Sequence, residues 1–323
     1  MDENLKIDSA DVKTRIVEFI GSVLEKRGID GLVVLYRDCL ESITNVHLAI
    51  ETVGKSNVKL LVTKGMLTNK QPREEMDLKS INKYLKLPEV NIIFASQENA
   101  FKEIQKVFSE QYDLKFGLLS HEALPTLNYN LSYLLLREMA KSEIEKKTYT
   151  PPSQKPLSQR EKFIQRTIAF HKSQIRLRVL LAFLLAETEN CSIFGNSNKT
   201  EWLLGLFTKF GTYHACDFLP LADLYRTQVI QLAGYLGLQE YLDCKKYQAP
   251  SIYKYFFNTS VDIVDRILIR LESGFSIGAI YEETGIPLEV IKKVEYYRQV
   301  SEYARTVPLI PELKFNEAIP QML

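Results

Sequence analysis

The chain has little of what marks several classes of protein. Its 323 residues include four cysteines, and no two of them form a C-x-x-C pair, which argues against a zinc site or a disulfide framework. Its 41 basic residues are balanced by 40 acidic ones, so a dedicated nucleic-acid binder is not expected. No apolar run reaches ~18 residues, so no segment is expected to span a bilayer and no membrane partner is expected.

Two further absences concern targeting and metals. The first four residues are acidic and polar, without the basic and apolar regions of a signal peptide, which together with unpaired cysteines predicts a cytoplasmic protein. The four histidines show no spacing such as H-E-x-x-H, so they are assigned no catalytic role. Hydrophobic residues at 46% and charged residues at 25% are ordinary values for a globular protein of one large or two smaller domains.

The order of apolar runs indicates the fold class. Residues 12–24 have apolar side chains at helical spacing, which predicts an amphipathic helix that ends near Gly28. Four short apolar runs predict buried strands, namely Gly31–Tyr36, 58–62, 90–95 and Cys191–Phe194. Helices are expected between them, among others over 43–53 and 158–189. Strands that alternate with helices predict an α/β fold, a Rossmann-like, doubly wound parallel sheet.

The second half of the chain predicts further organisation. Residues 146–158 are rich in proline and polar side chains, which indicates a linker or long loop. Beyond Pro250 helices are expected over 261–271, 277–283 and 287–305. We therefore expect an α/β nucleotide-binding core over residues 1–250 and a helical C-terminal extension over 251–323 that packs on it.

The strongest chemical signal follows the strand Cys191–Phe194. A turn of glycine, asparagine and serine leads into a helix start that carries Lys199, Thr200 and Glu201. A helix start offers free N–H groups and a positive dipole end, lysine adds a cation, and glutamate can hold a divalent metal. This combination suits a nucleoside triphosphate with its Mg²⁺. For Asn198-Lys199-Thr200 alone, an ordinary capped helix start would suffice.

Three blocks in order strengthen the nucleotide interpretation. Residues 195–201 read G-N-S-N-K-T-E, residues 207–211 read F-T-K-F-G, and residues 220–229 read P-L-A-D-L-Y-R-T-Q-V. Together they resemble the NAD synthetase family of the ammonia-dependent type, within the adenine nucleotide alpha-hydrolase superfamily. The resemblance implies a ligase that amidates deamido-NAD with ammonia through an acyl-adenylate and releases AMP and pyrophosphate. It also implies ATP and Mg²⁺ as cofactors and a homodimer built on helices.

The resemblance implies roles for particular residues of this chain. Lys199 and Asp217 correspond to catalytic positions, and Glu201 and Glu41 correspond to metal ligands. The positions that correspond to ATP-binding residues are Ser42, Arg176, Thr200, Arg226 and Thr227.

The turn after the first strand departs from the family. The family has S-G-G-x-D-S there, whereas residues 37–42 read R-D-C-L-E-S, so Ser42 alone is identical and Glu41 is a longer acidic substitute. Glycines in such a turn let backbone N–H groups approach phosphates, but Asp38 and Cys39 carry side chains. Arg37 offers a cation instead. The turn either binds pyrophosphate in a changed geometry or no longer binds it.

Further departures affect the substrate side. Of the family's run G-D-G-G-x-D, only the terminal Asp217 survives in residues 211–217, and the first acidic residue is lost. Near the C-terminus Tyr303 and Ala304 precede Arg305 where the family often has H-K-R. Two alternatives therefore remain open beside the ligase. The chain is a catalytically inactive relative that acts as a nucleotide sensor or partner subunit, or it adenylates a different carboxylate.

Overall fold

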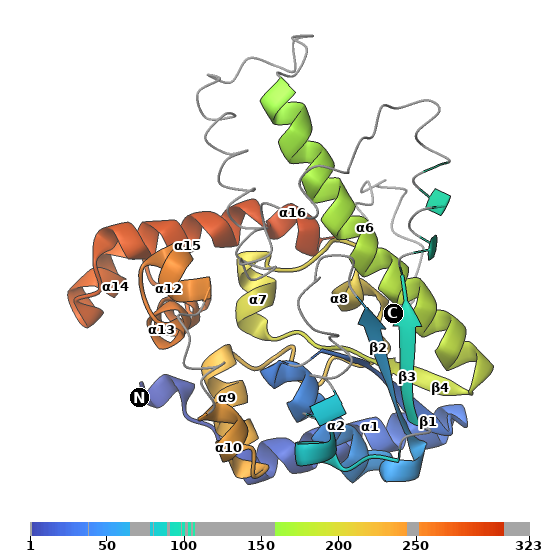
Figure 1. Cartoon of the computed structure of the whole chain (residues 1–323). Coiled ribbons are helices and arrows are strands. Elements are labelled where there is room, and N and C mark those ends of the chain that lie inside the picture. The colour runs from blue at the N-terminus through green and yellow to red at the C-terminus, as the bar shows by residue number, and fades with distance from the viewer. Residues whose placement is uncertain are drawn as a thin grey trace, which may run out of the picture.

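The computed structural model describes residues 2–37, 39–64, 78–79, 81–88, 91–97, 99–100, 103–104, 106, 159–243 and 252–306. Asp38 and the expected loop over 146–158 lie outside these residues. At the centre is a parallel four-stranded sheet in the order β3-β2-β1-β4 (Figure 1). Its strands are β1 (Gly31–Tyr36), β2 (Val58–Lys64), β3 (Ile92–Ser96) and β4 (Cys191–Phe194). The expected α/β fold is confirmed.

Helices cover both faces of the sheet, so β1 is buried along its whole length. Leu32, Val34 and Tyr36 pack in one cluster with side chains of α1 (Ser9–Arg27) and α2 (Leu40–Val53). The alternate residues Val33 and Leu35 pack on the other face against Ala182 and Ala186 of α6 (Gln159–Thr188). Figure 1 shows α1 and α2 on one side of the strands and α6 on the other. This two-sided burial is why the run from Gly31 to Tyr36 is continuously apolar.

The element bounds follow the sequence expectations closely. β1 and β4 begin and end where expected, β2 runs two residues further, and β3 begins at Ile92, while Val90 lies outside the described residues. α1 ends at Gly28, whose φ of 63° lies in the left-handed region that glycine adopts without strain. The long helix α6 matches the expected span to within one residue at each end.

The remaining elements are shorter. η1 (Glu3–Leu5) precedes α1, η2 (Lys55–Asn57) lies between α2 and β2, and η3 (Ile81–Leu85) lies between β2 and β3. After β4 come α7 (Lys199–Leu204), α8 (Thr212–Ala215), α9 (Arg226–Tyr235) and α10 (Gln239–Leu242). After residue 251 come α12 (Ile252–Phe257), α13 (Val261–Glu272), α14 (Ile277–Thr284), α15 (Leu288–Val300) and α16 (Glu302–Arg305). The C-terminal helices form a hydrophobic cluster of their own with Leu203 and Leu204 of α7. Figure 1 shows α13 and α15 beside α7.

The expectation of a continuous helix over 287–305 is wrong, because the chain turns at Ser301 between α15 and α16. The buried hydroxyl of Ser301 donates a hydrogen bond to the carbonyl oxygen of Leu203 at 2.8 Å. The guanidinium of Arg305 donates to the same carbonyl at 2.9 Å. Ser301 and Arg305 thus supply hydrogen-bond donors to a carbonyl group in the last turn of α7, where carbonyl groups lack a partner within the helix. Helical periodicity does not reveal this requirement, because α7 lies in another part of the chain.

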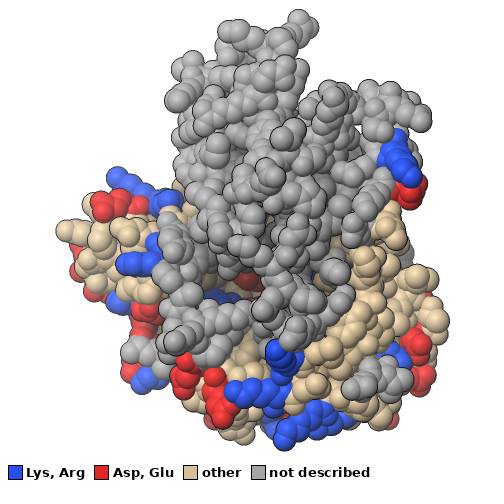
Figure 2. Space-filling view, viewed as in Figure 1, with Lys and Arg blue, Asp and Glu red and all other residues tan. Residues whose placement is uncertain are grey.

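Charges of both signs are dispersed over the described surface. In the view of Figure 2, basic and acidic side chains lie interspersed along the lower and left edges. Among the described helices, none is both long enough and apolar enough to cross a membrane.

Candidate active site

The candidate site lies where β1 and β4 end side by side. The two strands are parallel neighbours, with Val34 paired to Phe194, so their carboxyl ends meet at one edge of the sheet. α2 begins four residues after β1, and α7 begins five residues after β4. In a parallel α/β sheet this edge, with its helix N-termini, is where ligands bind. It brings Glu41 of α2 and Glu201 of α7 together, although they are far apart in sequence.

Asparagine side chains hold the two turns against each other. Asn45 of α2 donates from Nδ2 to the carbonyl oxygen of Gly195 at 2.5 Å and to Oδ1 of Asn196 at 3.0 Å. Asn196 in turn donates to the carbonyl oxygen of Leu35 in β1. Gly195 leaves no room for a side chain, because an added Cβ would lie 2.5 Å from Sγ of Cys216. The turn after β4 is therefore fixed against β1 and α2.

Asn198 connects the two acidic residues. Its Oδ1 caps α7 by accepting from the backbone N–H of Glu201 at 2.9 Å. Its Nδ2 donates to Oε1 of Glu41 at 2.8 Å, and the residue is fully buried. The ordinary helix cap that Asn198 suggested is thus present, but the same side chain also orients a carboxylate from another helix.

Arg226 at the start of α9 balances Glu41. Its Nη1 forms an ion pair with the same Oε1 of Glu41 that accepts from Asn198. The side chain of Glu41 is 5% exposed and that of Arg226 is 20% exposed, so this charge pair is largely withdrawn from water. A buried carboxylate needs such a partner, because an unpaired charge in this position is costly.

The carboxyl group of Glu201 is electrostatically strained. Burial raises its pKa to about 8, the charge of Glu41 raises it as well, and Arg226 and Arg37 lower it. Its Oε2 lies 3.5 Å from Oγ of Ser197. Burial and the neighbouring charge of Glu41 thus favour the protonated form of Glu201 when no cation is bound. A divalent cation beside Glu201 would instead favour its charged form.

These two carboxylates fit Mg²⁺. Mg²⁺ prefers oxygen ligands and is often held by one or two carboxylates together with substrate phosphates and water. Across the described residues there is no group of three or more histidine, cysteine, aspartate or glutamate side chains that would hold a metal without such help. Glu41 and Glu201 would thus hold the ion and leave positions for a polyphosphate.

Thr200 and Thr227 meet at a residue that the sequence analysis missed. The hydroxyl of Thr200 donates to Oδ1 of Asp265 at 2.6 Å, and the backbone N–H of Thr227 donates to Oδ2 at 2.9 Å. Asp265 lies on α13 and is fully buried. A signal was available, since Asp265 follows Val261 by four residues and precedes Leu268 by three, which places it on the apolar face of its helix.

The ammonium group of Lys199 lies near two acidic side chains and an aromatic ring. It is 3.4 Å from a carboxylate oxygen of Asp223 and 3.4 Å from one of Glu272. It also lies 5.2 Å from the ring centroid of Tyr225, whose hydroxyl donates to Glu272. In this arrangement the charge of Lys199 is shared between two acidic side chains. Its catalytic role stays a prediction.

Ser42 stabilises the turn after β1. Its buried hydroxyl oxygen accepts from the backbone N–H of Arg37 at 3.0 Å and lies 3.3 Å from Sγ of Cys39. Cys39 is the residue before α2, and burial raises the pKa of its thiol, as does the charge of Glu41. Ser42, the one residue identical to the family pattern in this turn, thus forms hydrogen bonds within the turn. Its contact with ATP stays a prediction.

The two arginines of α6 differ in position. The exposed Arg176 donates from Nε and Nη2 to the carbonyl oxygen of Lys209 at 3.3 and 2.9 Å. Arg178 is buried and donates to the carbonyl oxygen of Tyr36 at 2.9 Å, at the end of β1. Arg178, which the sequence analysis did not choose, is therefore the arginine that reaches the ligand-binding edge of the sheet.

The segment after Gly211 contains an aromatic stack and Asp217. Tyr213 of α8 stacks on Trp202 of α7 with ring centroids 3.7 Å apart, and Phe207 stacks on Trp202 at 4.8 Å. Oδ2 of Asp217 accepts from the backbone N–H of Ile193 at 2.7 Å, so it satisfies a group of the outer strand β4. A catalytic role of Asp217 stays a prediction.

Comparisons with known proteins agree with this fold and motif order. A family model described as NAD synthase matches residues 133–308. The chain is 24% identical to an NH3-dependent NAD+ synthetase of Hyperthermus butylicus over 318 residues, which covers 97% of this chain and 94% of the relative. It is 33% identical to that of Methanocaldococcus jannaschii over 150 residues, which covers 45% of this chain and 58% of the relative. The second alignment thus spans little more than half of the relative.

Solved structures show the same fold. An NMN synthetase from Francisella tularensis superposes with a TM-score of 0.63 at 17% identity and covers 95% of this chain and 100% of its own. An NH3-dependent NAD synthetase from Campylobacter jejuni superposes with a TM-score of 0.58 at 17% identity, with the same two coverages. At such identities the likeness concerns the fold alone.

Proposed function

Because the chain belongs to the NAD synthase family, we propose that it is an ATP-dependent ligase that amidates deamido-NAD with ammonia. The nicotinate carboxylate attacks the α-phosphorus of ATP, and pyrophosphate leaves. Ammonia then attacks the acyl carbon of the adenylate, loses a proton, and displaces AMP. The products are NAD, AMP and pyrophosphate.

The observation that carries this proposal is the meeting of Glu41, Glu201 and Arg226 at the carboxyl ends of β1 and β4. The buried carboxylate of Glu41, the partly buried carboxylate of Glu201 and the guanidinium of Arg226 come from three different helices. Asn198 orients the carboxylate of Glu41 and caps the helix that carries Glu201. Packing alone gives no reason to gather these groups, because buried charges cost stability. A metal–polyphosphate ligand gives one, since it needs both anionic metal ligands and a cation.

In this proposal Glu201 and Glu41 hold Mg²⁺, which neutralises charge on the polyphosphate when it is bound. Arg226 is a cation for phosphate oxygens, and Thr200 and Thr227 are assigned to ATP by their positions in the family pattern. Ser42 shapes the turn after β1. The protein contributes orientation and charge, and little covalent chemistry.

The remaining predicted residues are assigned by their positions in the family pattern. In this proposal Lys199 and Asp217 serve the acyl transfer. Arg176 is assigned to ATP in the same way, and the buried Arg178 is the alternative from the same helix. We also propose a homodimer and a cytoplasmic location.

The direct test is an assay of the purified chain with ATP, Mg²⁺, deamido-NAD and ammonium, which follows NAD, AMP and pyrophosphate together. Stoichiometric formation of all three supports the ligase. A parallel assay with a known active synthetase is the positive control. Wild-type protein that forms no AMP in this assay contradicts the proposal.

Two further assays address the alternatives. The comparisons give no support to a catalytically inactive relative, and binding of ATP without AMP formation would be its signature. Replacing deamido-NAD by nicotinate mononucleotide tests for a different carboxylate substrate. Faster AMP formation with the mononucleotide would assign the chain a smaller substrate within the same chemistry.

A further inference from the structure

Asp265 of α13 bonds the starts of α7 and α9 at once. One carboxylate oxygen accepts from the hydroxyl of Thr200 at 2.6 Å, and the other accepts from the backbone N–H of Thr227 at 2.9 Å. Asp265 is fully buried, so no water competes for these bonds. A carboxylate with two well-made hydrogen bonds in a dry site is a rigid connection.

The direction of the hydrogen bonds defines the role of Thr200. A hydroxyl has one proton, and that of Thr200 is directed to Asp265. Its oxygen then accepts from the backbone N–H of Arg226 at 2.9 Å. While this chain of bonds persists, the hydroxyl of Thr200 has no proton to offer a phosphate. It connects the buried carboxylate to the first N–H group of α9.

The connected residues flank the charged groups of the candidate site. Thr200 directly precedes Glu201 in α7, and Thr227 directly follows Arg226 in α9. A shift of the Asp265 carboxylate would therefore move both helix starts, and with them a metal ligand and the cation that pairs with Glu41. We infer that Asp265 is a positioning residue of the proposed ATP site, which holds Glu201 and Arg226 in register with Glu41.

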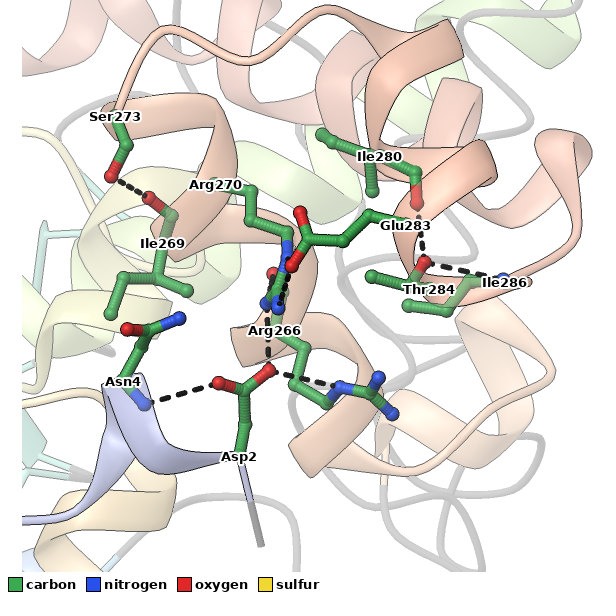
Figure 3. A network of polar contacts seen from close by, with 10 residues as sticks. All are labelled: Asp2, Asn4, Arg266, Ile269, Arg270, Ser273, Ile280, Glu283, Thr284 and Ile286. Carbon is green, nitrogen blue, oxygen red and sulfur yellow. Dashed lines mark hydrogen bonds and ion pairs between the residues drawn. The ribbon is translucent and has the colours of Figure 1, made fainter.

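Ion pairs also anchor α13 itself. Figure 3 shows Asp2 near the N-terminus facing Arg266 and Arg270 of α13, and Glu283 of α14 facing Arg270. Oδ2 of Asp2 lies 2.7 Å from Nη1 of Arg270 and 3.3 Å from Nε of Arg266, and Arg270 Nη2 lies 2.7 Å from Glu283. Arg266 directly follows Asp265, so these ion pairs fix the helix at the level of the buried carboxylate.

Burying the carboxylate of Asp265 costs stability, which suggests that this side chain has a role beyond packing. Burial raises the pKa of Asp265 to about 6, against which the hydrogen bonds from Thr200 and Thr227 act. An apolar side chain would fill the space between α13, α7 and α9 without this cost, as buried ionic groups often can be replaced by apolar ones. What an apolar side chain would not do is orient Thr200 and Thr227.

The inference rests on the proposed function, and Asp265→Asn tests it. Asparagine keeps the size but has a single acceptor oxygen, so one of the two bonds is lost and an N–H group faces a donor. We expect the variant to fold and its KM for MgATP to rise about 10- to 100-fold, the usual range for a residue that orients metal or substrate ligands. The KM for deamido-NAD should stay within about twofold. Asp262→Asn, on the exposed face of the same helix, is the matched control.

Thr200 gives a second route to the same connection. Thr200→Val removes the hydroxyl at nearly equal volume, and Thr200→Ser keeps it. We expect the valine variant to show the same rise in KM for MgATP. The serine variant should have a KM close to that of wild type. In the double variant with Asp265→Asn the rise should be no larger than in either single variant, because both break one chain of bonds.

A readout without nucleotide keeps the inference separate from the proposed function. In crystal structures of wild type and Asp265→Asn, we expect the ion pair between Arg226 and Glu41 to be broken in the variant. A lowered melting temperature with an unchanged ion pair and unchanged KM would overturn the inference and leave Asp265 a packing residue. Wild type without AMP formation would overturn the proposed function, while the crystal structures would still decide on positioning.

Discussion

The guanidinium of Arg226 is paired with the carboxylate of Glu41, which stands 185 positions earlier in the chain. Arg226 begins α9, Glu41 lies in the first turn of α2, and Asn198 before α7 donates to the same carboxylate oxygen. Three helix starts therefore meet at one oxygen atom.

Arg226→Met leaves Glu41 largely buried without its cation. We expect the free energy of unfolding at neutral pH to fall by about 1–3 kcal/mol, below the range for fully buried pairs because Arg226 is 20% exposed. Affinity for MgATP should fall more than affinity for deamido-NAD. Urea unfolding and binding titrations measure both. Arg15→Met, at an exposed position of α1, should cost no more than about 0.5 kcal/mol, and an equal loss in both variants would contradict the pairing argument.

Glu201→Gln keeps size and leaves the Asn198 cap on α7 intact, because that cap binds the backbone N–H. It removes a charged metal ligand, so we expect Mg²⁺-dependent formation of AMP to fall by at least about 100-fold. The far-UV circular dichroism spectrum should not change. Glu282→Gln, exposed on α14, is the control and should keep wild-type turnover. Wild-type turnover in the Glu201 variant would exclude Glu201 as a metal ligand.

Glu201 also predicts a pH dependence of stability. Its pKa is about 8 in the folded protein against an ordinary 4.5, so the folded state binds this proton more tightly than the unfolded chain. The contribution of Glu201 is therefore present at pH below about 4.5 and is lost as pH rises to about 8. Glutamine does not titrate, so the Tm of Glu201→Gln minus that of wild type should increase between pH 5 and 8.

Thermal unfolding of both proteins without Mg²⁺ measures this difference. The pKa of Asp265, raised to about 6 by burial, lowers stability in the same direction as pH rises, but it does so in both proteins and cancels in the difference. Adding Mg²⁺ at pH 8 should raise the Tm of wild type more than that of the variant. A difference in Tm that is constant from pH 5 to 8 would show that Glu201 titrates normally.

α6 carries exposed apolar side chains that support the proposed homodimer. Leu180 and Leu184 are 63% and 64% exposed, and Phe183 is 38% exposed, all within two turns of one helix. We expect Leu184→Glu to convert a dimer to a monomer at micromolar concentration, since a charge in an apolar interface is strongly unfavourable. Light scattering measures the mass. Tyr235→Glu, at the exposed end of α9, should leave the mass unchanged, and a monomeric wild type would contradict the prediction.

Most helices and strands of the fold can be predicted from local patterns in the chain. β1 and β4 were predicted with their observed bounds, because strands buried on both faces are continuously apolar. The end of α1 at Gly28 followed from a local backbone requirement. The block from Asn198 to Glu201 was recognisable because its residues act on one helix start and so lie together in the sequence.

Contacts between distant helices cannot be predicted from such local patterns. Periodicity describes each helix separately, so it contains no information that Glu41 pairs with Arg226, or that Asp265 of α13 joins Thr200 to Thr227. The packing of α6 on β1 placed Arg178, two residues after Arg176, at the ligand-binding edge. The physical reason is that partners of buried charges are selected by the packing of distant helices on the sheet, since a charge withdrawn from water must find its counter-charge wherever the fold supplies one.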